Sequence, residues 1–60
     1  MAQLNKVHFQ VAETLYAETY GREVAAGFTP EVAHRQARQA YLTYLAEVEA
    51  RLAAAGRRAR

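Results

Sequence analysis

Apolar residues recur at helical spacing in two long segments of the chain. The first segment covers residues 6–26, and its stripe repeats roughly every 3.6 residues. That stripe consists of Leu4, Val7, Val11 and Leu15. The second segment covers residues 30–55, and its apolar face consists of Ala37, Tyr41, Leu45, Val48, Leu52 and Ala55. The opposite face of the second segment holds few large apolar residues, so the pattern predicts two amphipathic helices with these bounds.

The residues between the two segments are typical of a helix end followed at once by a helix start. Gly27 suits the end, because glycine adopts the left-handed conformation without steric cost. Thr29 is the expected N-cap, and Pro30 tolerates the first helical position because its missing N–H has no partner there. The carboxylate of Glu31 favours the positive end of the helix dipole. A turn at 27–29 therefore predicts an antiparallel hairpin.

The remaining end signals lie at the two extremities of the hairpin. Asn5 is the expected N-cap of the first helix, and Gly56 the residue that ends the second. Residues 56–60 then form a short basic tail. The expected fold class is all-α, with residues 1–60 in a single domain.

Composition excludes several classes of function. The chain contains no Cys, Ser or Asp, so neither a disulfide nor a hydrolytic Ser/His/Asp triad can be assembled from it. We therefore expect no enzyme and no cofactor. A formal net charge of +2 permits an acidic partner without requiring one. No long apolar run and no signal-peptide pattern is present, which favours a cytoplasmic protein.

Two helices side by side cover only part of each other's apolar surface. In a lone hairpin we expect some of the tyrosines to stay exposed, together with Leu4, Phe9, Val11, Leu42 and Leu45. A symmetric homodimer, an antiparallel four-helix bundle, would cover them. The expected interface consists of Val7, Val11, Leu15, Tyr16, Tyr41, Leu45, Val48 and Leu52. The first hypothesis is thus a non-enzymatic homo-oligomeric module for protein interaction or regulation.

The four tyrosines of the chain gather at the middle of the predicted hairpin. They are Tyr16, Tyr20, Tyr41 and Tyr44, with Tyr16 at the level of Tyr41. Tyrosine offers a large rigid surface with a polar tip, which suits an interface. A core layer whose hydroxyls reach solvent explains the same residues.

Nucleic-acid binding is an alternative hypothesis. Phosphates would be contacted by Arg35, Arg38, Arg57 and Arg58. The aromatic residues available for base stacking, Tyr44 and Phe9, do not lie among these arginines. A solvated helix face and the helix dipole explain the arginines without a ligand.

A metal site is a second alternative. Glu31 and His34 have the Glu-x-x-His spacing of ferritin-like bundles, and Glu23 could bridge from the first helix. The motif stands in the first helical turn, where a site would be wet. Glu31 also stabilises the helix dipole there, and His34 closes the apolar face, so no metal is expected.

Overall fold

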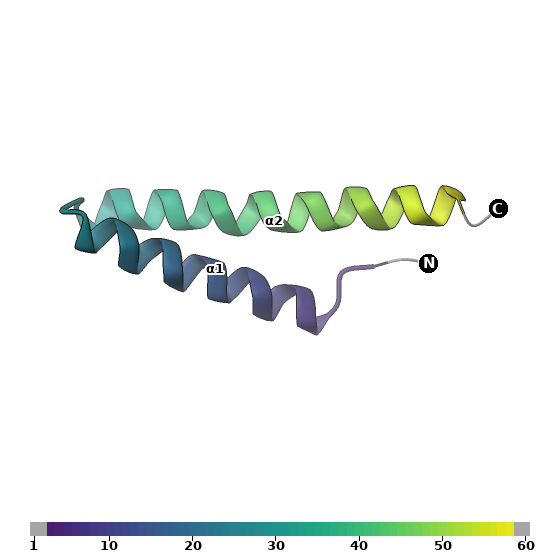
Figure 1. The fold of residues 1–60 in the computed structure, drawn as a ribbon, viewed down its shortest axis with the longest axis horizontal. Coiled ribbons are helices and arrows are strands. Elements are labelled where there is room, and N and C mark those ends of the chain that lie inside the picture. The colour runs from purple at the N-terminus through teal and green to yellow at the C-terminus, as the bar shows by residue number, and fades with distance from the viewer. Residues whose placement is uncertain (1–2, 59–60) are drawn as a thin grey trace.

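The protein is a hairpin of two long helices (Figure 1). The computed structural model describes the backbone of residues 3–58 and the side chains of residues 3–56. Helix α1 spans Lys6–Ala25 and helix α2 spans Pro30–Arg58. The molecule is elongated, with Cα extents of 50 × 16 × 13 Å. The predicted all-α antiparallel hairpin is confirmed.

Helix α1 begins with a capping box. The side-chain oxygen of Asn5 accepts hydrogen bonds from the backbone N–H groups of Val7, at 2.9 Å, and His8, at 3.2 Å. In return, Nδ1 of His8 accepts from the backbone N–H of Asn5 at 3.1 Å. Histidine takes the place that Glu or Gln fills in the usual capping box. The predicted N-cap is confirmed, and the part played by His8 was not predicted.

Helix α1 ends in a Schellman motif around Gly27. Gly27 has a φ of 98°, the left-handed conformation expected from its position. The N–H of Phe28 donates to the carbonyl of Glu23 at 3.1 Å, and the N–H of Gly27 donates to that of Val24 at 3.0 Å. Ala26 is the C-cap, so the helix is one residue shorter than predicted.

Helix α2 begins at the predicted residue. The hydroxyl of Thr29 accepts from the backbone N–H of Val32 at 3.2 Å, which confirms Thr29 as the N-cap. The Thr29 carbonyl accepts from the N–H of Ala33 at 2.9 Å. Pro30 is the first helical residue and Glu31 lies in the first turn. The turn between the helices is therefore short and fully capped on both sides.

The predicted end of α2 was wrong by one turn. We expected Ala55 to end the helix and Gly56 to follow it, but α2 continues to Arg58. Glycine ends a helix where the chain needs a left-handed residue, and Gly27 is the only described residue with positive φ. Inside a helix, glycine costs only about 1 kcal/mol relative to alanine, so Gly56 is tolerated. Arg57 and Arg58 thus extend the helix, and residues 59–60 of the expected tail lie outside the described part.

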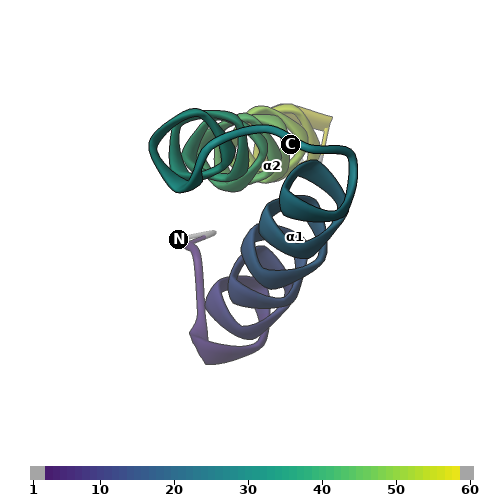
Figure 2. The ribbon, with the colours of Figure 1, turned by 90° about the vertical axis from the view of Figure 1, so that its left-hand side faces the viewer.

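The core between the helices is narrow and made mostly of small residues. Its buried members are Ala12 and Thr19 from α1, and Ala33, Ala37, Leu45 and Val48 from α2. Small side chains allow two helices to approach closely. The helices lie closest near the turn, and they cross and diverge toward the chain ends (Figures 1 and 2).

The buried face of α1 differs from the predicted stripe. It runs through Ala12 and Thr19, whereas Val7 and Val11 are exposed and Leu15 is half-buried. Apolar spacing alone selected the valines, but two small residues permit the closer helix approach. On α2 the predicted face is largely correct, except at its end, where Ala55 is exposed and Ala54 is half-buried.

Neither helix, within the described residues, combines the length and apolarity needed to cross a bilayer.

Candidate interaction surface

Large apolar side chains remain on the surface of the hairpin. The exposed ones are Val7, Phe9, Val11, Val24, Phe28 and Leu42. Val7 is 61% exposed, Phe28 51% and Leu42 49%. Among the described residues, no large side chain is completely buried. The predicted exposure of Phe9, Val11 and Leu42 is confirmed, but Leu4 is half-buried and Leu45 is buried. The tyrosines expected to be exposed are half-buried instead.

The residues predicted for the dimer interface fall into three groups. Val7 and Val11 are exposed and available to a partner. Four are half-buried along the helix contact: Leu15, Tyr16, Tyr41 and Leu52. Leu45 and Val48 are buried inside the single hairpin, so their apolar area is already used there. Phe9, Val24 and Leu42 are exposed residues outside the predicted set.

An aromatic cluster joins the two helices near the turn. The hydroxyl of Tyr16 is hydrogen-bonded to Nδ1 of His34. Their rings meet edge to face, with centroids 5.7 Å apart and an interplanar angle of 67°. On the other side, Tyr16 stacks on Tyr20 with centroids 6.2 Å apart. All four tyrosines are half-buried, so each keeps part of its surface in solvent.

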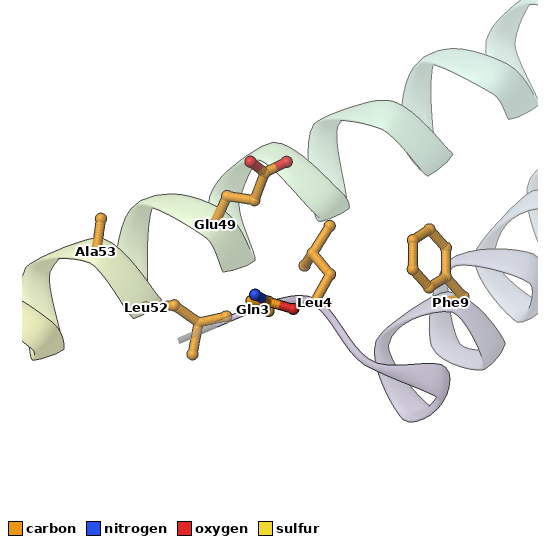
Figure 3. Close-up of a pocket in the computed structure, with 6 residues that line it drawn as sticks. All are labelled: Gln3, Leu4, Phe9, Glu49, Leu52 and Ala53. Carbon is orange, nitrogen blue, oxygen red and sulfur yellow. The ribbon is translucent and has the colours of Figure 1, made fainter. Parts of the chain in front are cut away.

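A cleft opens where the helices diverge (Figure 3). Its volume is about 470 Å³. The lining comes from three segments: Gln3 and Leu4 precede α1, Phe9 lies on α1, and Glu49, Leu52 and Ala53 lie on α2. Figure 3 shows the side chain of Leu4 between Phe9 and α2. Its lining combines the apolar side chains of Leu4, Phe9, Leu52 and Ala53 with the polar side chains of Gln3 and Glu49.

The residues considered for a metal do not assemble into a site. Glu23 is half-buried, whereas Glu31 and His34 are exposed. Across the described side chains, no three His, Cys, Asp or Glu residues lie close enough to share a metal ion. Nδ1 of His34 is occupied by the hydroxyl of Tyr16. The Glu-x-x-His spacing is therefore accounted for by the helix start and the aromatic cluster.

The arginines considered for nucleic acid lie at different places along α2. Arg35 and Arg38 are exposed in its first third. Arg57 and Arg58 end the helix, and their side chains lie outside the described part. Nucleic-acid contact by these residues stays a prediction.

Some important contacts were not found from the sequence. His8 stands three residues after the N-cap, where the second residue of a capping box belongs. This spacing could have indicated its hydrogen bond with the backbone N–H of Asn5. The cleft had no such signal, because it depends on the angle at which the helices diverge.

Compared with known protein families, curated proteins and solved structures, the chain matches none of them. The case for a function therefore rests on the surface of the hairpin.

Proposed function

We propose that this protein is a non-enzymatic interaction module that pairs with a second copy of itself. The observation behind the proposal is an excess of exposed surface. The hairpin has an accessible area of 4757 Å². A compact monomer of 6.7 kDa is expected to expose about 3,900 Å². The difference, about 850 Å², is close to the roughly 800 Å² that each partner buries in a standard interface.

The small core supports the same proposal. The buried apolar residues are three alanines with Leu45 and Val48, and alanine has little side chain to remove from water. The elongated shape also leaves more apolar surface in water. The radius of gyration is 14.3 Å, whereas a compact chain of this length has about 10 Å. Small domains without disulfides commonly gain their missing stability by oligomerising. Pairing two hairpins into a four-helix bundle would cover exposed residues such as Phe9 and Leu42.

Light scattering and thermal unfolding at several protein concentrations test this proposal. We expect a mass of twice 6.7 kDa, and a melting temperature that rises with concentration, because association stabilises the folded form by mass action. A hairpin that is monomeric at every concentration and melts cooperatively at one fixed temperature would refute the proposal.

A further inference from the structure

Building on the proposed self-association, we propose that the two copies dock antiparallel about a twofold axis, through one face of the hairpin. The turn end of each copy then meets the open end of the other, and we call this arrangement head-to-tail. We call it the aromatic face and define it by Phe9, Tyr16, Tyr20, Val24, His34 and Leu42. In this arrangement the turn of each copy covers the cleft of the other.

Helical spacing and one contact place these residues on one side of the hairpin. At about 100° per residue, Phe9, Tyr20 and Val24 follow the same side of α1. Tyr16 lies between that side and α2, where its hydroxyl meets His34. On α2, Leu42 lies about 80° around the helix from His34 by the same spacing, with the exposed Arg38 between them. The contact between Tyr16 and His34 therefore identifies which sides of the two helices form a common face.

The opposite side of α1 is a poorer candidate. Val7 and Val11 are exposed there, but the same side carries Glu18 and Arg22 in the next turns. Its apolar surface is therefore limited to the first half of the helix. The aromatic face also carries a charged residue, Glu13, but its exposed apolar residues lie in both halves of α1, with Phe9 in the first half and Val24 in the second. A partner that is itself a long rod can therefore contact apolar side chains along both halves of the helix.

The two ends of the hairpin are complementary. At the diverging end, Leu4, Phe9 and Leu52 supply the apolar part of the cleft lining, beside the polar Gln3 and Glu49. The turn end carries Val24 and Phe28, two exposed apolar side chains. Head-to-tail docking brings the turn of each copy to the cleft of the other. A twofold axis makes this contact twice, as an interface between identical subunits requires.

The register of the helices agrees with this arrangement. Pro30 lies near the turn and Leu52 lies in the cleft. A helix rises about 1.5 Å per residue, so the two residues are about 33 Å apart along α2. The midpoint is Tyr41. Head-to-tail pairing would thus place Tyr41 near the twofold axis, in the centre of the interface, where tyrosine commonly contributes most binding energy. Parallel pairing would instead place turn against turn and cleft against cleft.

Disulfide cross-linking distinguishes these arrangements, because the chain contains no cysteine of its own. The variant Val24→Cys/Ala53→Cys places one thiol on the aromatic face near the turn and one in the cleft, at two exposed positions. The two positions lie at opposite ends of one hairpin, too far apart for a bond within one copy. We expect oxidation to shift the protein to twice the monomer mass on a denaturing gel. Peptide mapping should then identify bonds between residues 24 and 53.

The matched control is Val24→Cys/Val7→Cys, with the second thiol at the same end of the hairpin as residue 53 but on the opposite side of α1. We expect no bond between residues 24 and 7 there. Bonds from 24 to 24 and from 53 to 53 would establish parallel docking and refute the head-to-tail arrangement, as would bonds from 24 to 7 in the control. A wild-type dimer by light scattering whose double-cysteine variant is helical but forms no 24 to 53 bond would also refute it. In all these cases self-association itself would stand, whereas a wild-type monomer would refute both proposals.

Discussion

The hydroxyl of Tyr16 on α1 is hydrogen-bonded to Nδ1 of His34 on α2. Among the described side chains it is the one hydrogen bond that joins the two helices. The other helix contacts depend on apolar packing, which is less directional. This bond therefore helps to fix how far the two helices are rotated toward each other near the turn.

Removing the Tyr16 hydroxyl should weaken the hairpin modestly. Tyr16→Phe keeps the ring contacts but loses the bond, and we expect the free energy of unfolding to fall by about 0.5–1.5 kcal/mol. Chemical denaturation of Tyr16→Phe, His34→Ala and the double variant measures the coupling. If the two effects simply add, the hydrogen bond contributes nothing to stability.

The glycines should respond to alanine with opposite signs. Gly27 has positive φ, so Gly27→Ala should lower the free energy of unfolding by about 1–2 kcal/mol. Gly21 lies inside α1, where an added Cβ would meet no atom within 4 Å. Gly21→Ala should therefore raise the same free energy by about 0.5–1 kcal/mol. Thermal unfolding of both variants checks the pair, and a stabilising Gly27→Ala would contradict the assigned turn.

The capping box of α1 should tolerate some substitutions and not others. Asn5→Ala removes the acceptor for the N–H groups of Val7 and His8, and should cost about 1 kcal/mol of stability. Asn5→Asp keeps an acceptor and serves as the control. His8→Gln keeps a side chain that can reach back to the Asn5 N–H, so it should cost less than His8→Ala. Circular dichroism during denaturation measures all four variants.

Charge on the aromatic face should prevent pairing, whereas the same charge on the other side should not. Val24 and Val7 are both exposed valines of α1. Val24→Glu would bury a carboxylate in the proposed interface, which is costly without a partner. We expect it to shift sedimentation toward the monomer, while Val7→Glu leaves the dimer intact. If Val7→Glu dissociated the dimer and Val24→Glu did not, the interface would lie on the opposite side of α1, which would contradict the proposed face.

The sequence determined the features that depend on a few neighbouring residues. Helix periodicity, the Asn5 cap and the stop at Gly27 were all predicted correctly, because each involves groups within about one helical turn. The buried face of α2 was also largely predicted, since apolar residues continue along its length. Gly56 shows the limit of such signals, because glycine permits a helix end without requiring one.

Only the tertiary structure decided which side of α1 meets α2 and where the helices separate. Thr19 is buried and Val11 is exposed, although hydrophobicity alone predicts the reverse. The small residues of the core set the distance between the helices, and the crossing angle then opens the cleft at Phe9 and Leu52. Tyr16 was predicted level with Tyr41, yet its hydroxyl reaches His34, about two helical turns nearer the start of α2. Such contacts depend on helix separation and rotation, which result from packing between distant residues and are not encoded in local spacing.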